Sequence, residues 1–256
     1  MPNSPHPLDN AAWHALTGPH AHLAEVVGPA RRYPRSVSFF SAVDRLDADG
    51  WDALADLAGP GGSLLVSRPD VPPPPPGWTE LGCVKGYQMV LEGPLGPGPD
   101  PDRGPDRDGF GPIRPLAAED VPAMLALTEL TRPGPFLPET FSLGGYVGVV
   151  RDGGGDRRGE LVAMAGQRLR LPGYTEISAV CVHPDVTGRG LATAVTRHVA
   201  SAIVARGETP FLHVTVANDP ARRVYERLGF TIRTTIDFTA LQAPAPAADR
   251  CALAEA

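Results

Sequence analysis

The chain has 256 residues, of which 42% are hydrophobic, enough for one large domain or two modest ones with a substantial core. Its formal net charge of −6 and pI near 5.6 exclude the basic footprint that general nucleic-acid binders carry. No apolar run approaches the length that crosses a bilayer, and the N-terminus lacks the basic and apolar regions of a signal peptide. These observations predict a cytoplasmic protein without nucleic-acid or membrane partners.

Cysteines and histidines give no sign of a metal site. Cys83, Cys181 and Cys251 stand far apart without CxxC spacing, so we expect free thiols in a reducing compartment. His20 and His22 could be taken for a metal pair, but no third candidate ligand is near them in the sequence. We therefore expect both histidines on a loop or a helix surface, and no bound metal.

Residues 1–92 predict an N-terminal α/β domain that carries no recognisable chemical motif. A polyproline run at 68–78 indicates a stiff, extended connector within it. The expected elements are helices at 10–28 and 47–59 and strands within 31–44, 61–68 and 83–93.

Residues 93–109 consist mostly of Gly, Pro, Asp and Arg. Such a composition cannot bury apolar surface, so it predicts an exposed linker between two domains. A long surface loop inside a single domain is the alternative.

Residues 110–241 predict a second domain in which strands and helices follow one another closely. The tail at 242–256, rich in Ala and Pro, is expected to be disordered. The expected strands lie at 110–116, 146–152, 160–171, 176–184, 210–216 and 230–241, the expected helices at 117–130, 190–207 and 219–229, and a short turn or helix at 138–142.

The stretch "VCVHPDVTGRGLATAV", residues 180–195, places two glycines where a strand gives way to a helix. Glycines at such a junction let backbone N–H groups and the positive end of the helix dipole face a ligand, which suits a pyrophosphate. Arg189 could add a guanidinium contact or lie solvated beside it. A dinucleotide-binding turn would need GxGxxG or GxGxxA directly after the strand, but here the third position is Thr193 and residues 183–187 stand before the first glycine. A Walker loop would need Gly-Lys-Ser/Thr, which this stretch lacks. A coenzyme A site is the remaining interpretation.

Two blocks resemble the GNAT superfamily of acyltransferases. Residues 180–193 resemble its acetyl-CoA motif, and "ANDPARRVYERLGF" at 217–230 resembles the helix that follows. Thr187, where the family prefers Gln or Arg, departs from the pattern. The matching positions are Gly190 and Ala192 in the first block and Asn218, Ala221, Tyr225, Gly229 and Phe230 in the second.

The resemblance covers roughly residues 110–240 and implies a mixed α/β (α+β) fold, with a mostly antiparallel sheet flanked by helices. Some members of the family carry a second, degenerate acetyltransferase-like half, and the smaller N-terminal α/β domain is compatible with that. The implied acyl donor is acetyl-CoA. The residues that the resemblance assigns to its binding are Val180, Cys181, Val182, Thr187, Gly188, Arg189, Gly190, Leu191, Ala192, Thr193, Asn218 and Tyr225.

The same resemblance suggests catalytic roles. Tyr225 is expected to protonate the leaving thiolate, and its alternative is a partly buried residue that packs beside Phe230. Glu176 matches the position of a glutamate base in one branch of the family, and His213 lies where another branch places its base. If neither residue is the base, water alone relays the proton.

The sequence thus predicts an N-acetyltransferase that moves an acetyl group from acetyl-CoA to a primary amine, of a small molecule or an amino acid, in a ternary complex. The expected partners are acetyl-CoA and this amine, with a homodimer as an option. A catalytically silent CoA-binding regulatory module is the main alternative, and a nicotinamide-dependent oxidoreductase is the third.

Overall fold

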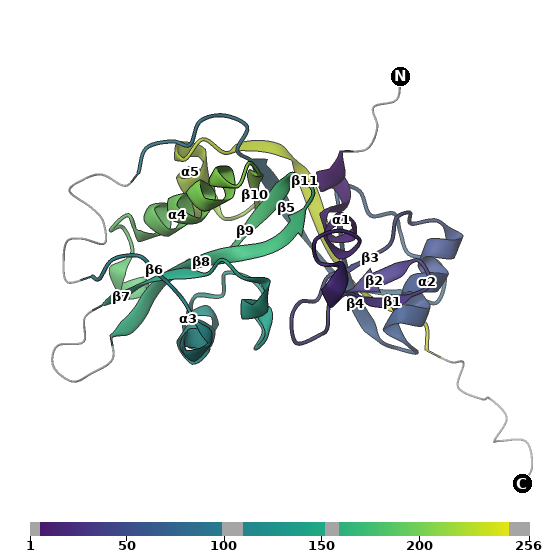
Figure 1. The fold of residues 1–256 in the computed structure, drawn as a ribbon. Helices are drawn as coiled ribbons and strands as arrows, with labels where there is room; N and C mark the ends of the chain where they lie inside the picture. Colours follow the sequence, from purple (N-terminus) through teal and green to yellow (C-terminus); the bar gives the residue numbers. More distant parts are fainter. Residues whose placement is uncertain (1–5, 99–109, 152–158, 246–256) are drawn as a thin grey trace, which may run out of the picture.

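The computed structural model describes residues 6–98, 110–151 and 159–245. One eight-stranded sheet runs through the molecule in the order β4-β11-β5-β10-β9-β8-β7-β6. A three-stranded sheet, β1-β2-β3, lies beside the β4 end of the large sheet (Figure 1). Every pairing in the large sheet is antiparallel except that of β9 with β10. The predicted fold class, a mixed and mostly antiparallel sheet flanked by helices, is confirmed.

The N-terminal unit is built from short elements. Its helices are α1 (Ala11–Leu16) and α2 (Ala48–Ala58), and its strands are β1 (Glu25–Val27), β2 (Ala30–Arg32), β3 (Ser41–Ala42) and β4 (Ser63–Arg68). Helix α2 ends as its sequence predicts, at Gly59 with a φ of 74°. The predicted helix at 10–28 is wrong beyond Leu16, because Gly18 and Pro19 interrupt it and β1 follows.

The C-terminal unit follows the predicted order of strands and helices. The hairpin loop expected at 153–159 lies almost wholly outside the described residues. The strands of the C-terminal unit are β6 (Arg114–Pro115), β7 (Val147–Arg151), β8 (Glu160–Leu171), β9 (Tyr174–Val182), β10 (Thr209–Thr215) and β11 (Thr231–Gln242). Its helices are α3 (Val121–Thr131), α4 (Leu191–Ala205) and α5 (Asp219–Arg227).

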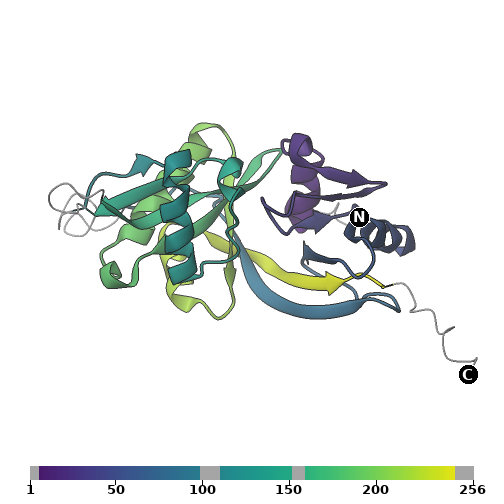
Figure 2. The ribbon, with the colours of Figure 1, turned by 90° about the horizontal axis from the view of Figure 1, so that it is seen from below.

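Strand β5 (Thr79–Val90) joins the two units. It comes from the predicted N-terminal domain, yet it lies between β10 and β11 and is hydrogen bonded to both. Figure 2 shows β5 and β11 as a long curved pair that spans the molecule. The predicted domain boundary at 93–109 therefore does not separate two sheets, and residues from both sides of it complete a single one.

The segment just after β5 also contacts the C-terminal unit. The Gly96 N–H donates to the Leu228 carbonyl at 2.9 Å, and the Arg197 Nε donates to the Gly96 carbonyl at 3.1 Å. A Cβ on Gly96 would lie 2.3 Å from the Arg227 carbonyl oxygen. Residues 94–98, predicted as exposed linker, are therefore attached to α4 and α5, while 99–109 lie outside the described residues.

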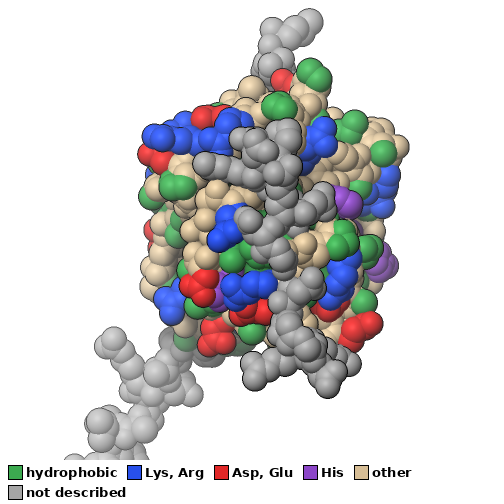
Figure 3. Space-filling model, turned by 90° about the vertical axis from the view of Figure 1, so that its left-hand side faces the viewer, with side chains coloured by type: hydrophobic (Ala, Val, Ile, Leu, Met, Phe, Trp, Pro, Cys, Tyr) green, Lys and Arg blue, Asp and Glu red, His purple; other side chains and the backbone are tan. Residues whose placement is uncertain are grey.

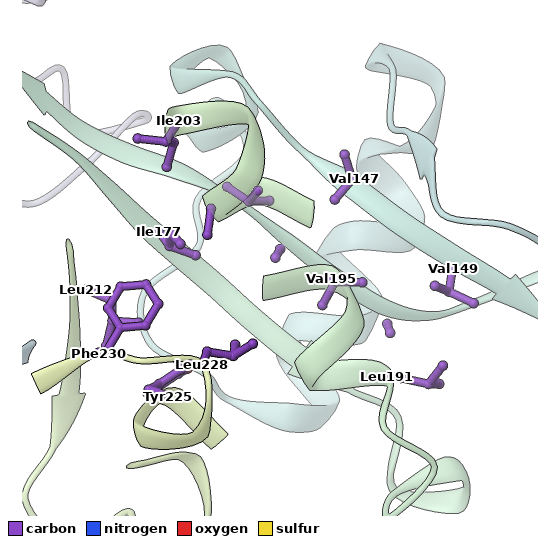
Figure 4. Close-up of a cluster of buried hydrophobic side chains, with 14 of the residues drawn as sticks. Val147, Val149, Ile177, Leu191, Val195, Ile203, Leu212, Tyr225, Leu228 and Phe230 are labelled. Atoms are coloured by element: carbon purple, nitrogen blue, oxygen red, sulfur yellow. The ribbon is translucent and has the colours of Figure 1, made fainter. Parts of the chain in front are cut away.

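The largest core cluster lies between α4, α5 and the strands β7 to β10, and Figure 4 shows ten of its side chains labelled. Met89 and Leu91, from β5 and the residue after its end, belong to this same cluster. A second cluster, around Leu16, also contains residues of β8 and β10 and so packs the N-terminal unit against the large sheet, and a third lies around Trp51. The core of the C-terminal unit thus depends on residues that precede position 92.

The distribution of charge on the surface and the length of the helices agree with what the composition predicts. On the end of the molecule that Figure 3 presents, basic and acidic side chains are interspersed, so this face offers no continuous basic stripe. None of the helices in the described residues is long and apolar enough to span a bilayer.

A fragment that begins at Gly109 is expected not to fold alone, because β10 and β11 would each lose the strand between them together with Met89 and Leu91. Circular dichroism and thermal melting of this fragment test the expectation. Co-expression with residues 1–98 is the control and should restore a cooperative transition. A fragment that melts cooperatively by itself would instead establish two independent domains.

Candidate active site

Strands β9 and β10 separate part of the way along their length. They pair from Thr209 and Tyr174 to Leu212 and Ile177, and their pairing ends there. Past that point the two strands line a cavity of about 800 Å³, which we call the interstrand cavity. On β9 its wall is residues 178–182, whose backbone edge facing β10 has no strand partner.

The interstrand cavity runs between the two units of the molecule. On one side it is lined by Asn218, Ala221 and Tyr225, at the start and on one face of α5. On the other side it is lined by the N-terminal segment 37–40, by β5 and β11, and by the loop after α3. The N-terminal unit therefore forms part of the wall of the cavity.

A β-bulge lies in the β9 wall. Ala179 and Val180 stand opposite the single residue Ala165, and Ala179 has a φ of 54°. A side chain in this left-handed region carries a conformational cost, and such residues gather where the backbone must be re-aimed at a functional site. The bulge marks the middle of the cavity wall as a place where backbone groups leave the regular ladder.

The glycine turn, residues 187–190, leads into the 15-residue helix α4. Gly188 and Gly190 both have positive φ angles, 78° and 77°, which is why glycine is needed at these positions. Gly190 is the N-cap of α4, and no side chain caps the helix. The first N–H groups of α4 therefore remain available at the positive end of its dipole, as an anion site requires.

The other predicted CoA-binding residues differ in what they can contribute. Leu191 is buried in the core, so it offers only its backbone N–H (Figure 4). Arg189 lies over the Phe110 ring at 5.8 Å, and the Thr187 hydroxyl donates to the Pro184 carbonyl at 3.1 Å. Asn218 accepts the Ala221 N–H and so caps α5 at the edge of the cavity.

Tyr225 is only 7% exposed, packs edge-on to Phe230 and lines the cavity (Figure 4). Both roles considered for it from the sequence are therefore compatible with its position. Its hydroxyl has no hydrogen-bond partner among the described residues. Burial, with a smaller contribution from Cys181, raises the pKa of Tyr225, so its phenol stays protonated at neutral pH.

Glu176 lies beside Arg168 in the interior of the sheet. It is fully buried, it does not line the cavity, and the guanidinium of Arg168 binds both of its oxygens at 2.9 and 2.5 Å. Burial by itself raises the pKa of this carboxyl, but Arg168 and His213 outweigh it and hold the pKa at about 2. These contacts favour Glu176 as the anion of a buried ion pair, and its role as the base stays a prediction.

His213 lines the cavity, but both of its ring nitrogens are engaged. Nδ1 lies 2.7 Å from Glu176 Oε1, and Nε2 lies 3.1 Å from the side-chain nitrogen of Gln88. The amide of Gln88 is oriented by its other partners, since Arg233 donates to its oxygen at 2.6 Å and its nitrogen donates to the Leu8 carbonyl. Nδ1 thus carries the proton and Nε2 accepts from Gln88. In this arrangement His213 has no free lone pair to act as the predicted base.

Sequence reasoning missed Arg168, Gln88 and Arg233, which hold these groups in place. A signal for Arg168 was present, because Arg168 and Glu176 are opposite charges on two mostly apolar strands that are joined at Pro172-Gly173. No comparable signal marks Gln88 or Arg233, since their strands, β5 and β11, come together only in the fold.

Burial determines the state of the Cys181 thiol and the position of His20. Cys181 lines the cavity, and burial raises the pKa of its thiol to about 12, so it is not a nucleophile at neutral pH. His20 is buried against the Tyr33 hydroxyl at 2.8 Å, which corrects its expected surface position. Among the described residues no group of three or more potential ligands could hold a metal ion.

Comparison with known proteins agrees with this geometry. The family model described as FR47-like protein matches residues 154–238. A crystal structure from Novosphingobium aromaticivorans, assigned to the GNAT family of acetyltransferases, is 34% identical with a TM-score of 0.79, covering 94% of this chain and 100% of its own. A GCN5-related N-acetyltransferase from Kribbella flavida shares the fold at 19% identity and a TM-score of 0.57, covering 91% of this chain and 96% of its own. No curated protein matches the sequence.

The identity and full coverage of the first of these structures go beyond a shared fold. They agree with the parted strands β9 and β10 and with α5, which line one cavity, and with the glycine turn at the start of α4. The chain belongs to the GNAT family and is an acyltransferase.

Proposed function

We propose that the protein transfers an acetyl group from acetyl-CoA to a primary amine of a small molecule or amino acid, by direct attack within a ternary complex. The observation that carries this proposal is the interstrand cavity, which joins the parted strands and Tyr225 on one side to the N-terminal unit on the other. A single cavity of about 800 Å³ has room for a thioester arm and a small acceptor together.

The donor is bound by backbone more than by side chains. The pyrophosphate of acetyl-CoA occupies the glycine turn and the first turn of α4, residues 188–193. The pantetheine arm pairs with the free edge of Val180, Cys181 and Val182. This route brings the thioester to the part of the cavity that Tyr225 lines.

The chemistry needs few protein groups. The neutral amine nitrogen attacks the thioester carbonyl, the C–S bond breaks, and Tyr225 gives its proton to the departing thiolate before regaining one from solvent. Backbone N–H groups at the Ala179 bulge stabilise the oxyanion. Glu176 and His213 are both engaged in the buried network, so water takes the proton that the amine loses.

Gly190→Glu tests the donor site. A carboxylate in the glycine turn repels a pyrophosphate, so the rise in melting temperature that acetyl-CoA gives the wild type, worth about 2.7 kcal/mol at 100 times Kd, is expected to disappear. Gly173→Glu is the matched control, because Gly173 also has a positive φ, 81°, but lies in the β8–β9 turn with open space around it. An undiminished shift in Gly190→Glu would place the donor elsewhere.

Turnover separates an enzyme from a silent module. Release of free CoA in the presence of a panel of amines is expected from the wild type. A shift in melting temperature with acetyl-CoA but no release with any amine would favour the CoA-binding regulatory module instead.

A further inference from the structure

Building on the proposed acetyl transfer, we propose that the acceptor is a small amine with a carboxylate beside its amino group and an apolar side chain, as in an apolar amino acid, and that Arg132 binds this carboxylate. The proposal rests on the walls of the interstrand cavity on the side of the N-terminal unit. These walls carry apolar surface, one uncompensated positive charge and, among the described residues, no acidic side chain.

The apolar part of this wall is exposed in the free protein. Phe39 is 46% exposed and Val84 is 53% exposed, although both line the cavity. Phe238 and Ala240, on the neighbouring strand β11, continue the same surface. Large apolar side chains that stay open to solvent inside a cavity indicate an occupant that covers them. An acceptor with an aliphatic or aromatic body fits this surface.

The charge on the wall points to an anion. Two arginines line the cavity, and the guanidinium of Arg168 is already paired with Glu176. Arg132 is exposed, and its side chain has no hydrogen bond or ion pair with any described residue. A guanidinium without a partner favours a carboxylate, which it can bind through two parallel hydrogen bonds. The same charge disfavours polyamines and basic peptides.

Arg132 lies apart from the expected phosphates of acetyl-CoA. It follows α3 directly, and α3 lies on the opposite face of the sheet from α4, which begins at the glycine turn (Figure 1). Its backbone is fixed in the left-handed region with a φ of 48°, where its N–H donates to the Thr128 carbonyl at 2.8 Å. The anion that Arg132 binds therefore belongs to the acceptor and is not a phosphate of the donor.

The test compares acceptors that differ only in the carboxylate. Leucine and phenylalanine are measured against 3-methylbutylamine and 2-phenylethylamine, with spermidine as a cationic acceptor. We expect kcat/KM to be at least about tenfold higher for the two amino acids. Arg132→Gln should raise the KM of the amino acids about 10- to 100-fold and leave the KM of the plain amines and of acetyl-CoA unchanged.

Two further variants serve as controls. Arg132→Lys keeps the charge and should restore part of the loss, whereas an arginine that only stabilises the end of α3 would not affect KM at all. Arg45→Gln removes an exposed positive charge that does not line the cavity and should change nothing. Equal use of amines with and without the carboxylate, or a KM that rises for both in Arg132→Gln, would overturn the proposal.

Val84→Asp is a second, independent test of where the acceptor binds. Val84 is already exposed, so the added carboxylate is not buried, and it should shift the preference from the amino acids towards the plain amines and spermidine. An unchanged preference would contradict the assigned position of the acceptor.

The proposed function and this inference fail in different ways. Transfer to plain amines without any preference for a carboxylate refutes the inference and leaves the acetyl transfer intact. If no amine is acetylated, the acetyl transfer is refuted. The binding of the acceptor carboxylate by Arg132 can then still be tested, by comparing the melting temperature of the CoA complex in the presence of leucine and of 3-methylbutylamine. Equal melting temperatures with these two ligands would reject that binding.

Discussion

Replacement of Tyr225 by phenylalanine is expected to lower kcat by about 10²- to 10⁴-fold and to leave the affinity for acetyl-CoA unchanged. The ring stays packed against Phe230, so only the hydroxyl at the cavity is lost. That hydroxyl acts when charge develops on sulfur, which is a property of the transition state and not of the bound donor. Steady-state kinetics together with acetyl-CoA binding measurements separate these two effects.

The control for this variant is Tyr87→Phe. Tyr87, on β5, is a partly buried tyrosine that packs against the same core cluster as Tyr225, but it does not line the cavity, so its loss of a hydroxyl should leave kcat unchanged. A fall in kcat of less than about threefold in Tyr225→Phe would mean that water, and not the phenol, supplies the proton.

Glu176→Gln is expected to cost about 3–5 kcal/mol of stability, because it leaves the guanidinium of Arg168 buried without its counter-charge. The amide also cannot accept at both of its ends: if its oxygen faces His213 and the Nη2 of Arg168, its nitrogen, a donor, faces the Nε of Arg168, which is a donor too. Chemical denaturation at pH 7 measures the loss. The double variant Arg168→Met with Glu176→Leu removes both charges and should be more stable than Glu176→Gln.

The pH dependence of stability gives the same pair a second test. The pKa of Glu176 falls from an ordinary value of 4.5 to about 2 on folding, so its contribution is complete above pH 4.5 and is lost as the pH falls towards 2. The wild type should therefore lose stability over this interval more steeply than Glu176→Gln. If Glu176 were the catalytic base instead, the variant would remain stable and recover activity as the pH rises. A stable variant with that pH profile would refute the structural role.

Local patterns in the sequence predicted much of this fold. The acidic start and glycine stop fixed α2 within one residue at each end, and the apolar spacing from Leu191 to Ile203 predicted α4. The glycine turn was found because positive φ angles at a strand-to-helix junction leave a visible trace in the residue types. These features depend on neighbours in the chain.

Features that depend on distant residues were not predicted. The place of β5 between β10 and β11 is set by which strands meet in space, and nothing within residues 79–90 records it. The state of His213 was missed for the same reason, since it depends on Gln88 and, through Gln88, on Arg233. Residue type and position suggested a base, whereas hydrogen-bond partners from two other strands determine that its lone pair is occupied.

The place of β5 also bears on how the protein is made. Strand β5 leaves the ribosome before either of its neighbours, and it must wait for β10 and then for β11, which ends at Gln242. At ordinary synthesis rates that wait is on the order of ten seconds, during which both edges of the nascent strand stay open to other chains. The large sheet is therefore completed only after β11 has emerged, and slower translation or an early stop between residues 90 and 242 would extend the period in which the unfinished chain can aggregate.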